Sequence, residues 1–266
     1  MIAVLTTVRN GMPFLEENLA AVRAQRFRDF FHVVVDDAST DGTAAFLAKE
    51  GSEDLRVIAS PPVGRGRALN IGWRAIDADV VAILDADDAA SPAWLAEMGR
   101  IMADHPHIDV LTCRGVLAYE HMESTPAGED ALSRLTPDCF LKTNPVHHSG
   151  TLIRRSALEK AGGYDEGRRS LFDYALWIAL LEQGGQIWRV DRGYIFKRIH
   201  ARQHFEARDR LNYLAGCLQL RRRVSANLLA GSGALMPYLA FVYGLLPQEA
   251  RHWFRYWRHH GRRRAG

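Results

Sequence analysis

The sequence contains few cysteines and very little lysine. Only three of its 266 residues are cysteines, and Cys113, Cys139 and Cys217 lie far apart without any CxxC pair. This spacing provides no zinc-binding signature, and so few thiols are typical of a protein from a reducing compartment. Lysine supplies 4 of the 34 basic residues, so arginine carries most of the positive charge.

Signatures of several other protein classes are also missing. The chain opens on a strand-like segment, without the charged and apolar regions of a signal peptide. No GxGxxG follows that first segment and no GxxxxGKS or GxxxxGKT occurs. These absences argue against a dinucleotide-binding Rossmann domain and against a P-loop protein. We therefore expect a cytoplasmic protein with a differently built ligand site.

The composition is that of a globular protein, with 47% apolar and 24% charged residues. Its net charge of +3 is unevenly distributed along the chain. Residues 1–205 carry 23 basic and 28 acidic residues, whereas residues 206–266 carry 11 arginines, no lysine and 3 acidic residues. A codon preference explains arginine over lysine, but it does not explain the position of the charge. We expect an acidic body and a basic tail with different partners.

Strand-like and helix-like segments alternate through the first half of the chain. The strand-like apolar runs cover residues 3–7, 31–35, 55–59, 80–84 and 108–113. The helix-like segments lie between them, at residues 14–25, 43–49, 67–76 and 92–103. This alternation predicts an α/β fold with an open, mostly parallel sheet flanked by helices. Ligands of such sheets bind beyond the carboxyl ends of the strands.

Two acidic clusters follow strand-like runs. VVVDDASTDGT provides Asp36, Asp37 and Asp41, and VVAILDADD provides Asp85, Asp87 and Asp88. Carboxylates at the end of a buried strand cost free energy unless a cation compensates them. Aspartates also cap helices and form tight turns, so either cluster alone has an equally good structural explanation. Together at one sheet edge, they predict a shared site for a divalent metal and a phosphorylated ligand.

A basic, glycine-rich segment at residues 62–72 separates the two clusters. Its glycines permit a close approach of the backbone to a ligand. Arg65 or Arg67 can bind phosphate, and Asn70 can bond a ribose or a base.

At the level of whole motifs, the chain resembles the inverting family 2 glycosyltransferases. The resemblance begins with VLTTVRNGMPFLEENLAAVRAQRFRDFFHVVVDDASTDGT and GRGRALNIGWRAIDADVVAILDADD, and it continues through NPVHHSGTLIRRSALEKAGGYDE and LFDYALWIALLEQGG. It covers roughly residues 1–200. It implies a GT-A-type, Rossmann-like catalytic domain at 1–205, with a nucleotide-sugar-binding half (1–113) and an acceptor-binding half (114–205). The implied substrates are a nucleotide diphosphate sugar, most often a UDP-sugar, and a hydroxyl acceptor.

The resemblance also implies roles for individual residues. The residues that match nucleotide-binding positions are Thr6, Asp36, Asp37, Arg67, Asn70 and Asp85. The residues that match metal-binding positions are Asp87, with Asp88 sharing the work, and His200, with His204 as its neighbouring candidate. Oxygen ligands of this kind suit Mg²⁺ or Mn²⁺.

Asp173 matches the general base that takes the proton of the acceptor hydroxyl. Family members typically carry Glu-Asp here, whereas this chain has Phe172-Asp173, which puts an acidic acceptor contact in doubt. Asp173 is also suited to capping the helix that follows it. His147 and His148 are candidates for acceptor binding, and packed loop histidines are the alternative.

The basic tail, residues 206–266, is expected to be a helical appendage. Residues 228–246 are largely apolar, and RHWFRYWRHH follows at 251–260. Interleaved arginines and aromatics favour an anionic membrane surface. A helical hairpin packed on the body is the alternative, and the acidic body argues against nucleic acid. We expect peripheral or monotopic docking at the inner face of the membrane, which suits a lipid-linked or cell-surface glycan acceptor.

Two functions from different classes follow from these observations. The first is a metal-dependent inverting glycosyltransferase. The second is a non-catalytic, membrane-docked scaffold subunit that retains a sugar-nucleotide site. Intact Asp85, Asp87 and Asp173 favour the enzyme, and Phe172 is the one departure that favours the scaffold.

Overall fold

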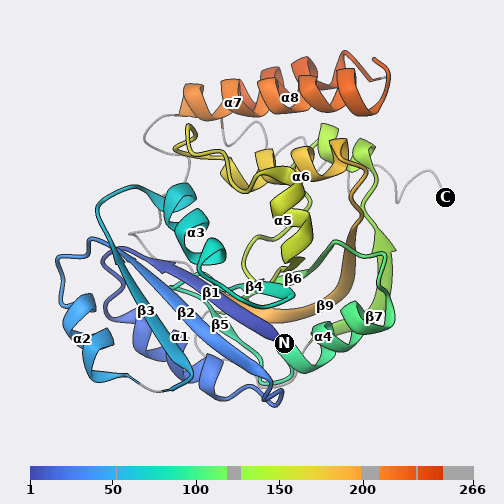
Figure 1. Ribbon diagram of the computed structural model, residues 1–266. Helices are drawn as coiled ribbons and strands as arrows, with labels where there is room; N and C mark the ends of the chain where they lie inside the picture. The colour runs from blue at the N-terminus through green and yellow to red at the C-terminus, as the bar shows by residue number, and fades with distance from the viewer. Residues whose placement is uncertain (52, 119–126, 199–209, 232, 248–266) are drawn as a thin grey trace. The chain divides into compact units, whose positions relative to one another are not determined.

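A computed structural model describes the chain except for residues 52, 119–126, 199–209, 232 and 248–266 (Figure 1). The chain divides into two compact units. The first comprises residues 1–136 and 144–203, and the second comprises residues 137–143 and 204–266. The boundary expected at residue 205 therefore lies in a segment outside the described residues.

The first unit is built on one central sheet. Its nine strands, counted over the described residues, are β1 (Ile2–Val8), β2 (Phe30–Asp37), β3 (Leu55–Ser60), β4 (Val80–Ile83), β5 (Ala89–Ala90), β6 (Val110–Ala118), β7 (Ala127–Arg134), β8 (Leu152–Arg154) and β9 (Ile187–Arg198). They are ordered β3-β2-β1-β4-β8-β6-β9-β5, and β7 also pairs with β9.

The first four long strands confirm the expected parallel sheet. β1 pairs in parallel with both β2 and β4, and β2 pairs in parallel with β3. The second half of the sheet is mixed, because β8 runs antiparallel to both β4 and β6. Gly150, with a φ of 88°, precedes β8 at the point where the chain approaches β4. A left-handed backbone at this position favours glycine.

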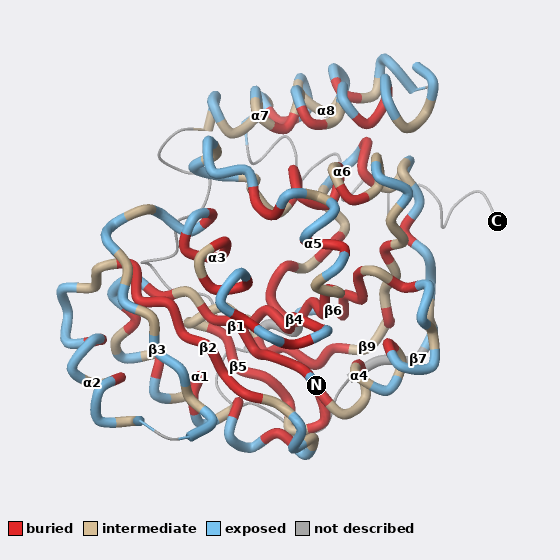
Figure 2. The backbone as a smooth tube through the Cα atoms, viewed as in Figure 1, coloured by how far each residue is buried: buried red, intermediate tan, exposed pale blue. Residues whose placement is uncertain are grey.

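Six helices flank this sheet in the described part of the first unit. They are α1 (Phe14–Arg23), α2 (Thr43–Lys49), α3 (Arg65–Arg74), α4 (Trp94–Asp104), α5 (Arg155–Ala161) and α6 (Phe172–Glu182). The two faces of β1 bury different neighbours. Val4 belongs to a core cluster with α1 and α4 residues, whereas Leu5 packs against Gly72 of α3. The sheet is thus covered on both faces, and its central strands are buried along their length (Figure 2).

The second unit is helical in its described part. It contains a short 3-10 helix, η1 (Pro137–Leu141), then α7 (Arg210–Arg223), the π-helix η2 (Val224–Leu228) and α8 (Met236–Leu245). Arg210 at the start of α7 donates to the carbonyl of Gly244 at the end of α8, and Arg222 lies over Tyr238 near the start of α8. The two helices therefore pack antiparallel. Among the helices described, none has both the length and the apolar composition needed to span a bilayer.

Candidate functional site

The candidate site lies at the carboxyl edge of the parallel strands. Asp36 and Asp37 are the last residues of β2, and Asp85 comes two residues after the end of β4. Parallel neighbours end at the same edge, so the strand pairing brings the two predicted acidic clusters to that edge.

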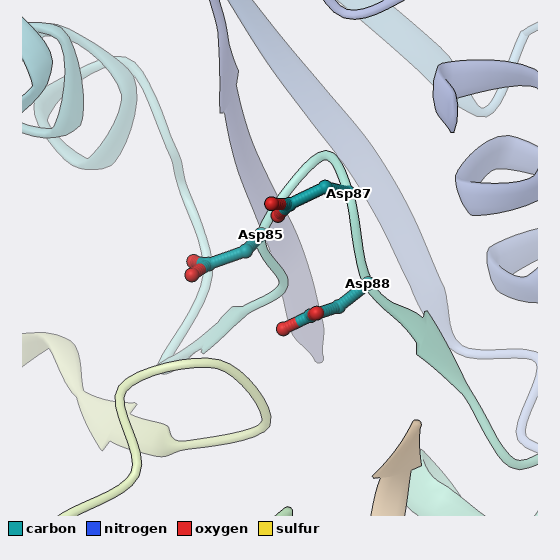
Figure 3. A group of neighbouring side chains, drawn as sticks. All are labelled: Asp85, Asp87 and Asp88. Atoms are coloured by element: carbon teal, nitrogen blue, oxygen red, sulfur yellow. The ribbon is translucent and has the colours of Figure 1, made fainter. Parts of the chain in front are cut away.

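Asp85, Asp87 and Asp88 form a compact carboxylate group. One carboxylate oxygen from each lies within 4.8 Å of the others, and Figure 3 shows the three side chains around one turn of the chain. The backbone N–H of Asp88 donates to the Asp85 carbonyl at 3.0 Å and closes this turn. Asn18 of α1 then holds it, because its Nδ2 donates to the carbonyls of Asp85 at 2.9 Å and Asp88 at 3.0 Å.

The pKa values of two of these carboxyls are shifted in opposite directions. For Asp85, burial alone raises the pKa, but Arg65 and a hydrogen bond from His148 outweigh it and hold the pKa well below its usual range. For Asp88, burial raises the pKa to about 7, and the charges of Asp85 and Asp87 add to the effect. The repulsion among the three carboxylates therefore raises the pKa of Asp88 in particular.

This donor set fits a hard divalent cation. Three carboxylates with oxygens within 4.8 Å of one another offer the oxygen ligands that Mg²⁺ and Mn²⁺ prefer. The raised pKa of Asp88 also indicates a cation site, because a bound cation would relieve the repulsion that keeps Asp88 protonated. His200 lies outside the described residues.

The carboxylate of Asp37 binds the backbone of the glycine-rich segment. It accepts hydrogen bonds from the N–H groups of Val63 at 2.7 Å and Gly64 at 3.0 Å. These bonds fix the entry into α3, whose first residue is Arg65. Asp36 instead accepts from the backbone N–H of Ser39 at 3.0 Å, which closes a turn after β2.

Three other predicted nucleotide-binding residues have different surroundings. Thr6 is completely buried, and its hydroxyl lies 2.9 Å from Nε2 of His32. Burial and the charge of Arg23 lower the pKa of His32 to about 3. Because side chains of a strand alternate, Thr7 faces the opposite side of the sheet. Arg67 is exposed on α3, with its Nε 3.7 Å from Glu166.

Asn70 uses its full hydrogen-bonding capacity within the protein. Its Nδ2 donates to the carbonyl of Tyr164 at 2.8 Å and to Glu166 at 2.9 Å. Its Oδ1 accepts from the Tyr164 N–H at 2.9 Å and from the Trp73 indole at 2.8 Å. A side-chain amide has two donors and two acceptor sites, so this geometry favours a bracing role over a direct contact with a ribose.

Arg65 is the basic residue of the glycine-rich segment that reaches the carboxylate group. It forms an ion pair with Asp85, and its guanidinium carbon lies 5.6 Å from the ring centroid of Phe172. The sequence left Arg65 and Arg67 as alternatives for binding phosphate. In the structure Arg65 pairs with Asp85 of the carboxylate group, whereas Arg67 pairs with Glu166.

Asp173 is the second residue of α6 and lies in its first turn. One of its carboxylate oxygens accepts a hydrogen bond from Nδ2 of Asn144 at 2.8 Å. No side-chain hydrogen bond caps the start of α6, so the alternative capping role of Asp173 finds no support there. The preceding Phe172 belongs to an aromatic cluster with His148 and Tyr164, with ring centroids 6.0 and 6.1 Å away.

The two adjacent histidines differ in position. Nδ1 of His148 lies 3.6 Å from the Asp85 carboxylate, and its Nε2 lies 3.0 Å from the Tyr164 hydroxyl. His148 thus connects the carboxylate group to the aromatic cluster beside Asp173. His147 packs against Gly115 of β6 and donates from Nδ1 to the Ser149 carbonyl at 2.6 Å, and burial lowers its pKa.

The domain model of glycosyl transferase family 2 matches residues 3–162 of this sequence. The match covers more than half of the chain and includes both acidic clusters. The chain belongs to the family 2 glycosyltransferases.

A curated relative agrees with this assignment, and two solved structures have a similar fold. The glycosyltransferase is 31% identical over 196 residues to the O-antigen biosynthesis protein RfbC of Myxococcus xanthus, covering 71% of this chain but 15% of that protein. S. aureus TarS 1-349 in complex with UDP superposes with a TM-score of 0.64 at 20% identity, covering 85% of this chain and 65% of that one. The Pyrobaculum calidifontis mannosyltransferase PcManGT, in complex with GDP-Man and Mn²⁺, has a TM-score of 0.63 at 20% identity and covers 95% and 82%. These two structures share the expected α/β fold.

The structure adds two asparagines that sequence reasoning missed. Asn18 braces the carboxylate group and Asn144 orients Asp173. A signal for Asn18 was present, since this polar residue lies on the buried face of α1 with Leu15, Leu19 and Val22. Asn144 had no such signal, because it lies in a loop 29 residues before its partner.

Proposed function

We propose that the protein is a metal-dependent inverting glycosyltransferase that moves a sugar from a nucleotide diphosphate sugar to a hydroxyl acceptor. The observation that carries this proposal is the group Asp85, Asp87 and Asp88 at the carboxyl edge of the sheet. Such a group is costly in a folded protein unless a cation and its ligand use it. The alternative, a non-catalytic scaffold, has no specific structural observation in its favour.

The donor half of the site is residues 1–113 in this proposal. Asp87 and Asp88 would hold Mg²⁺ or Mn²⁺, with Asp85 beside them and His200 as a further candidate ligand. The ion supplies charge neutralisation for the diphosphate as the glycosidic bond breaks. Arg65, next to Asp85, adds a fixed positive charge. Nucleotide binding is assigned to Thr6, Asp36, Asp37, Arg67 and Asn70, with Thr6 and Asn70 acting through the strand and helix they brace.

The acceptor half is residues 114–205, with Asp173 as the general base. Asp173 accepts the proton of the acceptor hydroxyl, whose oxygen attacks the anomeric carbon on the face opposite the leaving diphosphate. Asn144 holds the carboxylate in one orientation, which matters because a general base must lie within hydrogen-bond reach of the proton it takes. A single displacement of this kind inverts the anomeric configuration. His148 faces this side of the site, and His147 contributes through its packing.

The donor and the acceptor class are inferred by similarity. TarS binds UDP in one solved structure and PcManGT binds GDP-Man with Mn²⁺ in another. We propose a UDP-sugar as donor. RfbC is an O-antigen biosynthesis protein, and this supports a lipid-linked or cell-surface glycan as acceptor.

The helical unit supports the proposal of docking on an anionic membrane surface. Helix α8 has no charged residue, and its residues Leu239 and Val242, at 62% and 58% exposure, form an exposed apolar stripe with the N-cap residue Leu235 at 75%. The exposed Arg222 lies over Tyr238 at the edge of that stripe, so cationic and apolar groups adjoin. This pairing is typical of interfacial helices and suits the inner face of a cell membrane.

Calorimetric titration with UDP, GDP and dTDP, with and without Mn²⁺, tests the donor site. We expect one nucleotide to bind tightly only with metal, and Asp87→Asn to abolish that dependence. Asp173→Asn should keep nucleotide binding and lose sugar transfer. Nucleotide binding without any transfer or donor hydrolysis by the wild type would favour the scaffold, and unchanged turnover in both variants would refute the mechanism.

Vesicle sedimentation tests the membrane proposal. Leu239→Ser with Val242→Ser should reduce binding to vesicles that contain anionic lipid. Val57→Ser is the matched control, since Val57 is an exposed apolar residue of β3. Equal binding by all three proteins would show that α8 is not the docking element.

A further inference from the structure

The loop of residues 144–151, NPVHHSGT, contacts both halves of the proposed site. At its start, Nδ2 of Asn144 donates to the Asp173 carboxylate at 2.8 Å. Near its end, Ser149 is buried and contacts the carboxylate group. We call this segment the bridging loop, because it joins a contact with the proposed base to a contact with the proposed metal ligands.

Ser149 holds the turn that carries the three carboxylates. Its Oγ accepts a hydrogen bond from the backbone N–H of Asp85 at 3.1 Å. Its hydroxyl also donates a hydrogen bond to the side chain of Asp88. A serine hydroxyl donates one proton and accepts at the same time, so the two bonds are compatible. One side chain of the bridging loop therefore binds the backbone of one carboxylate residue and the side chain of another.

His148, the neighbouring residue of the bridging loop, lies beside the same turn. Its Nδ1 is 3.6 Å from the Asp85 carboxylate, and its Nε2 is 3.0 Å from the Tyr164 hydroxyl. Its ring centroid lies 6.1 Å from that of Trp177 in α6. The bridging loop therefore also packs against the helix that carries the proposed base.

The bridging loop is itself braced by the sheet. The carbonyl of His147 accepts hydrogen bonds from the hydroxyls of Thr112 at 3.0 Å and Thr151 at 2.6 Å. The N–H of Gly150 donates to the carbonyl of Ile83, the last residue of β4, at 2.6 Å. Functional groups keep their geometry when residues around them are locked by hydrogen bonds of this kind. A loop held in this way can fix the distance between the groups bound at its two ends.

We propose that Ser149 is a positioning residue, and that Ser149 and Asn144 together make the bridging loop the element that sets the distance between the bound metal and the proposed base. The inference rests on the proposed function, because it requires a cation at the carboxylate group and Asp173 as the base. Distance matters in such a reaction, since the reacting atoms must approach to about 3 to 3.5 Å. Ser149 acts through the metal ligands, as outer hydrogen-bonding partners of metal-binding carboxylates do.

Mn²⁺ binding to the full chain, followed by electron paramagnetic resonance, tests the metal end of the bridging loop. Ser149→Ala removes both hydrogen bonds, so Mn²⁺ should bind about tenfold more weakly. Ser149→Cys keeps a weak donor, so it should lose less affinity, and it replaces Ser149→Ala in the test if that variant does not fold. Ser156→Ala is the matched control, because it removes an exposed hydroxyl from α5 and should leave the affinity unchanged.

NMR of the Asn144 side-chain amide tests the base end of the bridging loop. Bound Mn²⁺ broadens proton resonances to an extent that falls steeply with distance, so the broadening reports how far the metal lies from Asn144. Diamagnetic Mg²⁺ provides the reference spectrum. With Mn²⁺ and UDP at saturating concentrations, Ser149→Ala should change the broadening, because the turn is no longer held against the loop. Ser156→Ala should reproduce the broadening of the wild type.

The two measurements distinguish the possible results. Unchanged Mn²⁺ affinity in Ser149→Ala, or an equal loss in Ser156→Ala, would refute a positioning role for Ser149. Weaker affinity with unchanged broadening would show that Ser149 serves the metal alone, which refutes the bridging role of the loop. Failure of the wild type to bind Mn²⁺ and UDP would overturn the proposed function, and this inference with it.

Discussion

Replacing Asp88 by asparagine should stabilise the ligand-free protein at neutral and alkaline pH. Asp88 is 4% exposed and lies beside two other carboxylates, and burial with their charges raises its pKa from 3.8 to about 7. A raised carboxyl pKa means that the folded state binds this proton more tightly than the unfolded chain. The unfolded chain therefore ionises first as the pH rises, and the folded state loses relative stability between pH 3.8 and about 7.

The size of this effect follows from the interval between the two pKa values. Each tenfold change in proton affinity corresponds to about 1.4 kcal/mol. The interval sets an upper limit of about 4 kcal/mol for the destabilisation at pH 8, and we expect Asp88→Asn to recover about 2 to 4 kcal/mol of it. At pH 4.5 Asp88 is protonated in the folded state and mostly ionised in the unfolded chain, but this pH is less than one unit above 3.8, so the gain should fall to about 1 kcal/mol.

Urea unfolding at pH 8 and pH 4.5, in the presence of a chelator, measures this difference. Asp77→Asn is the matched control, because Asp77 is fully exposed and should change the unfolding free energy little at either pH. Added Mn²⁺ should then stabilise the wild type more than Asp88→Asn. A variant that is no more stable than the wild type at pH 8, or one with the same gain at both pH values, would refute this account of the carboxylate group.

Three buried or bracing asparagines give further predictions. Asn18→Ala removes the amide that holds the carbonyls of Asp85 and Asp88, so calorimetry should show Mn²⁺ affinity reduced by about tenfold. Asn144→Ala frees the Asp173 carboxylate, so steady-state assays should show kcat about tenfold lower with nucleotide affinity unchanged. Asn70→Ala removes four hydrogen bonds, and urea unfolding should show a loss of about 2 to 4 kcal/mol.

The parallel half of the sheet could be predicted because its signal is local. β1, β2, β3 and β4 are apolar runs of strand length with amphipathic helices between them, and each predicted run overlaps the observed strand. The insertion of β8 between β4 and β6 had no such signal. Three residues of strand are too few to show a period, and their antiparallel direction depends on contacts distant in sequence.

The sequence predicts where the site residues lie along their strands, but it does not predict which residues they bind. The acidic clusters were placed at one edge because strand ends determine where they lie. Thr6 and Thr7 both stand near a strand end, yet only the packing of His32 shows that Thr6 faces the interior. Asn70 is similar, because the Tyr164 backbone that occupies its amide lies 94 residues away.

His147 and His148 illustrate the same limit within one dipeptide. Adjacent residues in an irregular loop have no fixed period, so sequence alone could not assign one histidine to Asp85 and the other to Gly115. The structure resolves this through the aromatic contacts of His148 with Tyr164 and Phe172. The aromatic Phe172 thereby fits the cluster it belongs to, which explains how a residue other than glutamate is accommodated before Asp173.

The carboxylate group also shows how folding and ligand binding oppose one another in this protein. Asn18 uses both of its donors to keep Asp85 and Asp88 together, although the proximity raises the free energy of the ligand-free fold through Asp88. A bound cation reverses the sign of that interaction, since the same three carboxylates then share a positive charge. Metal affinity should therefore rise as the pH approaches about 7 and level off above it, and the stability gained on adding metal should follow the same course.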